Sequence, residues 1–596
     1  MRKLLIYLGD YKKETVLAPL FKMLEASFEL LIPLIMAQII DGGIADADRG
    51  FILQMCLLMT VLGIIGLVCS VTAQFYAAKA AVGFSADLKH ALFQHIQSLS
   101  FSEIDAIGTP TLITRLTSDV NQVQSGINLV LRLFLRSPFI VLGAMVMAFT
   151  IDVWAALVFV VAIPLLCLAV FGIMLISMPL YRRVQGGLDR ILGMTRETLT
   201  GARVIRAFCR EEEEIRQFQE QNKALSRMQM FVGRISALMN PVTCVIVNGG
   251  VMALVWSGAL RVEGGYLTQG EVIALVSYMS QILTELIKLA NLIITVTKAF
   301  ACGDRLQAVL ETEPGMQAGR GSGQAEAAAA AGQRPGSAGR SPAEEQEEAV
   351  CFDHVCLTYQ GAGAEALTDI SFRVKRGQTV GIIGGTGSGK SSLVSLIPRF
   401  YDATKGSVRI HGVDVREYSL KELRERIGMV MQKAVLFQGS IRENLLWGKQ
   451  DASEDEMWEA LETAQAREFV EAKEGGLDAP VAQGGKNLSG GQRQRLTIAR
   501  ALVRKPDILI LDDSASALDL ATDARLRRAI RELEDDPAVF IVSQRTASVL
   551  HADLIIVLED GRIAGLGTHK ELLETCRVYR EIHDSQFKKE GRHDGR

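Results

Sequence analysis

Six long apolar stretches in the first half of the chain constrain its fold more than any other feature. A helix that crosses a bilayer needs about 20 mostly apolar residues, and each stretch meets that length. The mean hydropathy of the chain, +0.21, is unusual for a soluble protein. The sequence therefore predicts a polytopic α-helical membrane domain with six transmembrane helices, at Val16–Ile40, Phe51–Ala77, Leu129–Thr150, Val153–Ile176, Ile235–Leu260 and Gly270–Val296.

The segments between these spans alternate in length. Two of them, Ala78–Asn128 and Ser177–Arg234, are long, polar and patterned like helices, whereas the others are short. Lysine and arginine gather in the long segments and before the first span, which predicts that these segments and both termini face the cytoplasm. Each long segment contains a break, at Ser100–Pro110 and at Thr200–Ile205, where the chain is expected to turn.

Several charged residues fall inside or next to the predicted spans. Glu285 and Lys288 either face a cavity or partner helix, or neutralise each other as an i,i+3 pair. Glu25 and Glu29 in the first span raise the same question. Two arginines at the start of the third span are expected to snorkel to the membrane surface, namely Arg132 and Arg136.

Composition excludes some other classes of protein. The net charge of −3 does not favour nucleic-acid binding. Nine scattered cysteines form no metal-binding CxxC pair and are interpreted as reduced thiols. No small-residue cleavage site follows the basic N-terminus, so the first span is expected to serve as the targeting signal. Residues 311–349 are rich in Gly, Ser, Pro and Glu and predict a flexible linker, with a regulatory segment as the alternative.

A phosphate-binding loop begins the second half. The apolar run Thr379–Ile383 predicts a buried parallel strand, and a helix is expected over Ser391–Arg399. The residues between them fit G-x-x-x-x-G-K-[ST], in which backbone N–H groups surround phosphate oxygens, Lys390 reaches the phosphates and Ser391 holds Mg²⁺. The predicted nucleotide-binding residues here are Gly384, Gly385, Thr386, Gly387, Ser388, Gly389, Lys390, Ser391 and Ser392.

Two further motifs accompany this loop. A second predicted strand, Ile508–Leu511, ends at Asp512, and a carboxylate in that position suits Mg²⁺ coordination. A second anion site is predicted at a helix N-terminus, where Ser489 is a suitable N-cap. Its four residues are Ser489, Gly490, Gly491 and Gln492.

Together these motifs resemble those of ABC transporters of the exporter type, with a membrane domain and an ATPase domain in one chain. The resemblance implies domains at residues 1–310 and 350–590, the second being an α/β P-loop nucleotide-binding domain. It also implies that Tyr359 stacks on adenine, that Gln432 contacts Mg²⁺, and that Ser516–Asp519 forms the D-loop. In this family two ATPase domains close head to tail, and each ATP lies between one P-loop and the other domain's signature helix. The chain turns near residues 102–108 and 200–206 would be coupling helices.

Two positions depart from the family pattern. The residue after Asp512 is usually glutamate and is Asp513 here, and the switch histidine is replaced by Gln544. Aspartate is one methylene shorter than glutamate, and glutamine carries no proton or charge near neutral pH. The stretch Val481–Asn487 also lacks a glutamate common in homodimeric exporters. The chain therefore resembles the degenerate-site subunit of bacterial heterodimeric multidrug exporters, with a partner chain that carries Glu and His; a slow homodimer is the alternative.

The resemblance implies ATP- and Mg²⁺-dependent export of amphipathic drugs, lipids or peptides across the cytoplasmic membrane, with no role for nucleic acid. An ATP-gated channel or a signalling regulator is the alternative from another class. The six spans exclude a soluble mechanical ATPase, and importers of this family generally carry their two domains on separate chains.

Overall fold

The computed structural model describes residues 2–316, 348–514 and 517–587 and divides into two compact units. The helical unit comprises Met1–Gln97 and Thr109–Thr312, and the α/β unit comprises Ser98–Gly108 and Glu313–Arg596. Most of the predicted linker, residues 317–347, lies outside the described residues.

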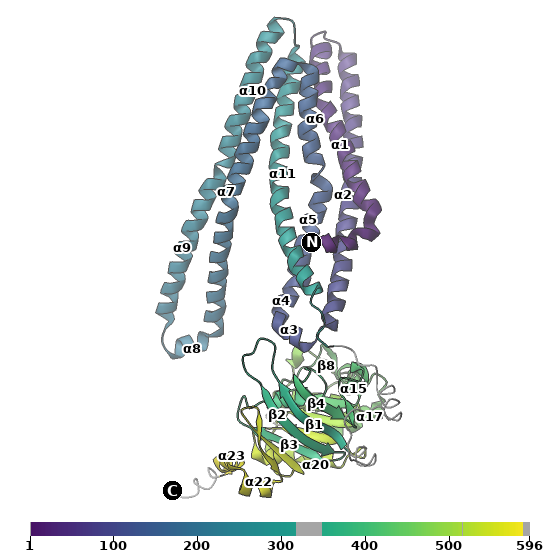
Figure 1. Cartoon of the computed structure of the whole chain (residues 1–596). Helices are drawn as coiled ribbons and strands as arrows, with labels where there is room; N and C mark the ends of the chain where they lie inside the picture. Colours follow the sequence, from purple (N-terminus) through teal and green to yellow (C-terminus); the bar gives the residue numbers. More distant parts are fainter. Residues whose placement is uncertain (1, 317–347, 515–516, 588–596) are drawn as a thin grey trace. The chain divides into compact units, whose positions relative to one another are not determined.

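The helical unit consists of long helices joined by short turns (Figure 1). Its α-helices are α1 (Lys12–Gln38), α2 (Arg49–Ser98), α4 (Thr109–Thr114), α5 (Val120–Leu133), α6 (Arg136–Ile151), α7 (Val153–Thr200), α8 (Ala202–Ala207), α9 (Glu211–Ala237), α10 (Met239–Glu263) and α11 (Gln269–Leu310). Three short stretches of 3-10 or π-helix complete it, at Arg2–Tyr11, Ile39–Ile44 and Arg115–Asp119.

Six helical stretches of the described chain are long and apolar enough to cross a membrane, and each contains one predicted span. The prediction of a six-helix membrane domain is therefore confirmed. The long polar segments are helical as well, since α2 continues to Ser98 and α7 to Thr200. Hydrogen bonds within each helix satisfy the backbone through the apolar region, where water is absent.

Both predicted breaks contain a short helix. Helix α3 (Phe101–Ile107) belongs to the α/β unit and begins with a capping box, in which the Ser100 N–H donates to Glu103 Oε2 at 2.8 Å. Gly108 ends α3 with a φ of +83°, a conformation that favours glycine. At the second break α7 ends at Thr200 and α8 begins at Ala202.

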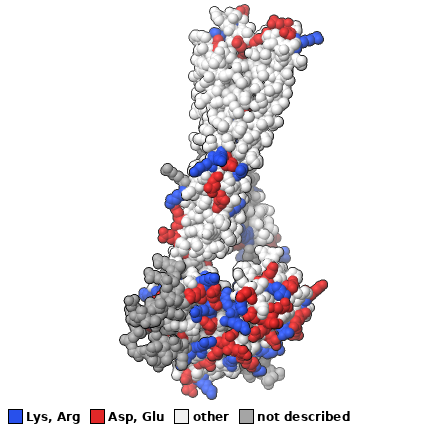
Figure 2. Space-filling model, turned by 90° about the vertical axis from the view of Figure 1, so that its right-hand side faces the viewer, with Lys and Arg blue, Asp and Glu red and all other residues white. Residues whose placement is uncertain are grey.

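Small residues let the membrane helices approach one another closely. Helix α11 packs against α1, α5 and α6, while α7, α9 and α10 form a long hairpin that diverges from these helices towards α8 (Figure 1). Gly126 of α5 lies against Ala299 of α11, and Gly143 of α6 lies against Leu30 of α1. On the face shown in Figure 2, a broad band of the helical unit carries only uncharged side chains.

The arginines at the start of the third span differ from each other. Arg136 is only 7% exposed, and its guanidinium pairs with Glu285 and Glu29, so the snorkelling prediction was wrong for this residue. An apolar environment makes an unpaired charge costly, and carboxylates on two other helices neutralise Arg136 instead. Lys288 pairs with Glu285, as the i,i+3 alternative requires, but Glu285 also contacts the neighbouring helix α6.

The α/β unit contains a four-stranded antiparallel sheet, ordered β2-β1-β4-β5, and a six-stranded sheet, ordered β12-β11-β3-β10-β9-β6. Its strands are β1 (Glu348–Leu357), β2 (Leu367–Lys375), β3 (Thr379–Gly384), β4 (Lys405–Ile410), β5 (Val413–Asp414), β6 (Ile427–Val430), β7 (Gly439–Ser440), β8 (Pro480–Val481), β9 (Ile508–Asp512), β10 (Ala538–Val542), β11 (Leu554–Glu559) and β12 (Arg562–Gly567). Its other helices are α14 (Lys390–Ser395), α15 (Leu420–Glu425), α16 (Ile441–Leu446), α17 (Glu454–Thr463), α18 (Arg467–Glu471), α19 (Gly490–Leu502), α20 (Leu520–Arg531), α21 (Thr546–Val549), α22 (His569–Thr575) and α23 (Arg577–Phe587).

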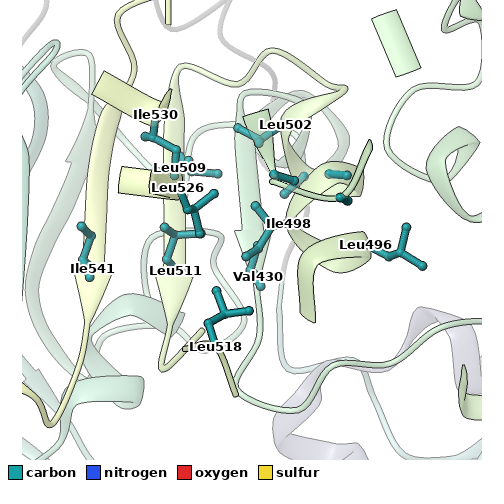
Figure 3. Close-up of a cluster of buried hydrophobic side chains, with 14 of the residues drawn as sticks. Val430, Leu496, Ile498, Leu502, Leu509, Leu511, Leu518, Leu526, Ile530 and Ile541 are labelled. Atoms are coloured by element: carbon teal, nitrogen blue, oxygen red, sulfur yellow. The ribbon is translucent and has the colours of Figure 1, made fainter. Parts of the chain in front are cut away.

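The two strands predicted from apolar runs are both present, as β3 and β9, and every residue in them is buried. Uninterrupted apolar sequence is typical of parallel strands covered on both faces. Side chains of β6, β9 and β10 form one core with those of α19 and α20 (Figure 3), including Val430, Leu511, Ile541, Ile498 and Leu526. The helix after the P-loop is shorter than predicted, because α14 ends at Ser395 and turns continue to Arg399, whose φ is +53°.

The contact between α5 and α11 gives a first prediction. A Cβ added at Gly126 would lie 2.4 Å from the Ala299 Cβ, which cannot move unless the helices separate. Overpacking of this kind typically costs about 1–3 kcal/mol. We expect Gly126→Ala to lower the thermal unfolding temperature of the detergent-purified protein. Gly63→Ala is the control, because nothing lies within 4 Å of that position. Equal unfolding temperatures for the two variants would contradict the close packing.

Candidate functional site

A cavity of about 340 Å³ opens at the carboxyl edge of the six-stranded sheet. Strands β3, β10 and β9 are parallel neighbours, so the segments that follow them meet at one edge. The cavity is lined by Tyr359, Ala366, Thr386, Gly387, Gly389, Lys390, Ser391, Ser392, Gln432, Asp512, Asp513, Val542, Ser543 and Gln544. The parallel register thus brings together residues far apart in sequence, most of which the motifs had predicted.

The loop after β3 surrounds the ammonium group of Lys390. Lys390 Nζ donates to the carbonyl oxygens of Gly384 at 3.0 Å and Gly385 at 2.6 Å, and lies 3.5 Å from Ser388 Oγ. Burial lowers the pKa of Lys390, while the carboxylates of Asp513 and Asp512 act in the opposite direction. The three predicted residues of this loop that do not line the cavity, Gly384, Gly385 and Ser388, therefore still contact the Lys390 ammonium group.

Glycine is required at several points of this loop. Gly387 and Gly389 have φ values of +82° and +95°, which side chains rarely adopt. A Cβ on Gly389 would lie 2.8 Å from Leu367 Cδ2, and one on Gly384 would lie 2.2 Å from the Leu558 carbonyl oxygen. The loop therefore forms a tight backbone cradle at the start of α14, and its shape and its cation both fit a polyphosphate.

Two side chains whose oxygen atoms could bind a metal ion, Ser391 and Asp512, lie next to this cradle. Ser391 Oγ donates to Asp512 Oδ1 at 3.1 Å. Asp512 is 6% exposed, and burial raises the pKa of its carboxyl, although the Ser391 hydrogen bond opposes this shift. The described residues contain no cluster of three or more His, Cys, Asp or Glu side chains suited to a metal. A hydroxyl and one carboxylate fit Mg²⁺ instead, which commonly takes its remaining ligands from phosphate and water.

The two residues that depart from the family pattern both line the cavity. Asp513 has a φ of +47°, and its N–H donates to the Val542 carbonyl oxygen at 3.0 Å. Gln544 lies two residues beyond Val542, and its carbonyl oxygen accepts from Gln586 Nε2 at 2.8 Å. Because Asp512 and Val542 are register partners on β9 and β10, Asp513 and Gln544 follow neighbouring strand ends.

Tyr359 connects the cavity to α3. Its hydroxyl donates to Ser392 Oγ at 2.8 Å, and its ring meets the edge of Tyr401 with centroids 5.1 Å apart. The Tyr401 hydroxyl donates to Asp105 Oδ2 at 2.6 Å, and burial and this hydrogen bond raise the pKa of Tyr401. The centroid of the Phe101 ring lies 4.6 Å from the centroid of the Phe400 ring. The predicted turn near residues 102–108 therefore packs on the rest of the α/β unit.

Sequence reasoning missed the tyrosine and phenylalanine on which α3 docks. Phe400 and Tyr401 belong to no motif, and their only signal is a pair of adjacent aromatic residues after a turn. Ala366, Val542 and Ser543, which also line the cavity, were missed as well. Their positions follow from strand ends and loops that the sequence pattern did not locate.

The predicted signature residues are not part of this cavity. Ser489 begins α19 with a capping box, in which its Oγ accepts from the Gln492 N–H at 3.2 Å and its N–H donates to Gln492 Oε1 at 3.0 Å. The prediction that Ser489 is an N-cap is confirmed. Ser489 and Gly490 are exposed, and Gly491 lies close to the Ala517 carbonyl oxygen. Of the predicted D-loop, Asp519 caps α20 through the Thr522 N–H, while Ser516 lies outside the described residues.

Comparison with known proteins identifies both halves of the chain. A family model described as the ABC transporter transmembrane region matches residues 15–286, and one described as ABC transporter matches residues 367–516. The ABC transporter ATP-binding protein YfiB of Bacillus subtilis is 36% identical over 99% of both chains. The putative multidrug export ATP-binding/permease protein YgaD of the same organism is 31% identical over 98% of both. The solved structure of a bacterial Atm1-family ABC exporter with ATP bound has the same fold, with a TM-score of 0.75, 22% identity and coverage of 97% and 98%.

The position of Lys390 gives a second prediction. Hydrogen bonds that involve a charged group typically contribute about 1.5–3 kcal/mol, which corresponds to at least about tenfold in affinity. We expect Lys390→Ala to weaken binding of a fluorescent ATP analogue to the purified chain at least tenfold. Lys405→Ala is the matched control, because Lys405 is exposed and pairs with Glu365. Unchanged affinity in Lys390→Ala would exclude this cavity as the nucleotide site.

Proposed function

Because this chain belongs to the ABC transporters of the exporter type, with a membrane region and an ATPase region in one polypeptide, we propose that it is the degenerate-site half of a heterodimeric exporter. The family ATPase domain binds ATP and couples its hydrolysis to transport. The proposal concerns what distinguishes this chain within the family: its partner, its own nucleotide site and its cargo.

The cavity residues have distinct roles in this proposal. Lys390 and the loop backbone hold the phosphates of ATP, and Tyr359 offers its ring to adenine. Ser391 and Asp512 hold Mg²⁺, with Gln432 at the same site. The bound metal ion would neutralise charge on the transferring phosphoryl group. Asp513 and Gln544 occupy the positions at which the family usually has the glutamate and histidine that activate the attacking water.

The observation that carries the proposal is that both departures line the same cavity as an intact phosphate loop. The side chain of Asp513 is one methylene shorter than that of glutamate, so its carboxylate would hold the attacking water further from the γ-phosphate. A misplacement of about 1 Å can lower the rate about a hundredfold. Gln544 cannot supply a charge near neutral pH. The site therefore retains the groups that bind ATP and has weakened groups for its hydrolysis.

The signature segment supports a partner chain. Ser489 and Gly490 are exposed at the start of α19 and do not line the chain's own cavity. Their backbone N–H groups would complete an ATP site on a second ATPase domain. With Glu and His at the equivalents of Asp513 and Gln544, the partner would hydrolyse ATP efficiently at that shared site.

Cargo and topology are also proposed. The relative YgaD is described as a putative multidrug export protein, and the apolar walls of the helical unit favour amphipathic small molecules, lipids or peptides.

We place the membrane domain at residues 1–310, a linker at 311–349 and the nucleotide-binding domain at 350–590, with both termini in the cytoplasm. ATP-driven accumulation of a fluorescent amphiphile in vesicles separates export from an ATP-gated channel, since a channel cannot move cargo against a gradient.

The third prediction concerns this chain purified without a partner. We expect ATP to bind but to be hydrolysed slowly, because every site then contains Asp513 and Gln544. The measurement is steady-state phosphate release in lipid nanodiscs, with Lys390→Ala as the measure of contaminating activity. Vigorous hydrolysis above that background would overturn the heterodimer in favour of a homodimer.

The fourth prediction tests the missing methylene. We expect Asp513→Glu to raise the hydrolysis rate of the lone chain several-fold while Gln544 is present, because the carboxylate moves towards the attacking water. Asp535→Glu, on the exposed turn after α20, makes the same chemical change away from the cavity and should leave the rate unchanged. If Asp513→Glu has no effect, this site contributes no hydrolysis at all.

A further inference from the structure

Ion pairs join four charged side chains where α1, α6 and α11 pack together: Glu29, Arg136, Glu285 and Lys288. Arg132 precedes Arg136 by four residues at the end of α5, and we call the five residues the membrane charge cluster. Arg136 lies at its centre. Its Nη1 donates to Glu285 Oε1 at 2.7 Å and its Nη2 to Glu29 Oε2 at 2.6 Å. Ser137 Oγ adds a hydrogen bond to Glu285 Oε2 at 2.8 Å. Arg136 therefore has two carboxylate partners in an apolar environment.

The other two cations lie at the edge of the cluster. Lys288 Nζ is 2.8 Å from Glu285 Oε1, which Arg136 also contacts, and its side chain is 42% exposed. Arg132 is half-buried, one helical turn before Arg136, and among the described residues it forms no ion pair. Its Nε is buried and has no hydrogen-bond partner there. Lys288 thus shares the Glu285 carboxylate with Arg136, and Arg132 pairs with no carboxylate among the described residues.

The cluster consequently carries surplus positive charge. It contains three cations and two carboxylates, so one positive charge is not neutralised. The nearest charged residues on α1 do not offset this surplus, because Lys22 and Glu25 pair with each other at 2.5 Å. A surplus charge in apolar surroundings is costly unless an ion of opposite sign neutralises it.

Antiparallel packing places the two edge cations on the same side of the cluster. Successive contacts between the α5–α6 segment and α11 join Asp119 to Arg305, Gly126 to Ala299 and Arg136 to Glu285. This order sets Arg132 at the level of Asn291, one turn beyond Lys288. Arg132 and Lys288 therefore lie on the same side of the Arg136–Glu285 pair along the helix axes.

A polar stripe on α11 runs through Lys288. Its members recur every three or four residues, are exposed or half-buried, and are Ser277, Ser280, Thr284, Lys288, Asn291 and Thr295. The four hydroxyls of the stripe donate to backbone carbonyls of the preceding turn. Lys288 and Asn291 are therefore the members that are unfavourable against lipid tails and suit a water-filled path or a polar ligand. Lys288 therefore lies on a polar face of α11, and Arg132 lies about one turn further along the helix axes.

We propose that Lys288 and Arg132 form an anion-recognition subsite for the acidic group, a carboxylate or a phosphate, of amphipathic cargo. The inference rests on the proposed export function and adds a substrate class to it. An acidic headgroup would neutralise the surplus charge, and low polarity around the cluster would strengthen the attraction. The apolar part of the same molecule would lie along the neighbouring uncharged helix surfaces.

The test measures binding to the full chain in nanodiscs of zwitterionic lipid. Three radiolabelled probes share a dodecyl or nearly equal alkyl chain: dodecyl phosphate, tridecanoate and dodecyltrimethylammonium. We expect the chain to bind at least one anionic probe about tenfold tighter than the cationic one, and the two anions separate phosphate from carboxylate recognition. Lys288→Gln and Arg132→Gln should each reduce anion affinity about fivefold or more, with little effect on the cation.

Matched variants distinguish charge recognition from folding. Lys298→Gln removes a cation from α11 outside the cluster and should leave anion affinity unchanged. Lys288→Arg and Arg132→Lys retain the charge and should keep most of the affinity, even if a glutamine variant fails to fold. Equal binding of all three probes, or equal losses in Lys288→Gln and Lys298→Gln, would overturn the subsite.

A separate flux measurement keeps this proposal distinct from export itself. With the partner chain present, ATP-driven uptake of the same probes into inverted vesicles reports transport. Anion-selective binding without uptake would overturn export and support the subsite, whereas uptake without charge preference in binding would overturn the subsite alone.

Discussion

The hydrogen-bonded register of three parallel strands, β3, β10 and β9, determines where the groups around the nucleotide cavity lie. Each strand is buried along its whole length, and each ends at the same edge of the sheet. Lys390 follows the first strand, Gln544 the second and Asp513 the third. A shift of one strand along its neighbour would separate the phosphate loop from the carboxylate that faces it. The apolar core between this sheet and α19 holds the strands in register, and it therefore also fixes the positions of the cavity residues at the strand ends.

The same register explains why two substitutions distant in sequence affect one site. Asp513 and Gln544 are 31 positions apart in the chain, but the pairing of Asp512 with Val542 brings their strand ends together. In the proposed function, changes at both positions weaken the activation of water, whereas the phosphate cradle is intact. This pattern is the physical basis for proposing that the chain holds ATP and that a partner chain carries the faster site.

Charge in the membrane region follows a different constraint. Lipid tails solvate neither backbone nor ionic groups. Backbone hydrogen bonds therefore form within helices, and buried cations form ion pairs with carboxylates. Arg136 satisfies this requirement through Glu285 and Glu29, on two other helices, and these ion pairs join α1, α6 and α11. Arg132 and Lys288 satisfy it incompletely. Incomplete neutralisation beside an exposed polar stripe is what distinguishes a recognition surface from a purely structural ion pair.

The sequence alone determined features that depend on local pattern. Six apolar stretches predicted six membrane helices, apolar runs predicted β3 and β9, and Ser489 predicted a helix start, because span length, strand burial and capping involve near neighbours in the chain. Tertiary structure alone decided which distant residues meet. Arg136 was expected at the membrane surface and lies buried between helices, since its carboxylate partners are more than 100 residues away on either side. Likewise, nothing in the sequence near Tyr401 indicates its hydrogen bond to Asp105, because that contact arises only when α3 packs on the α/β unit.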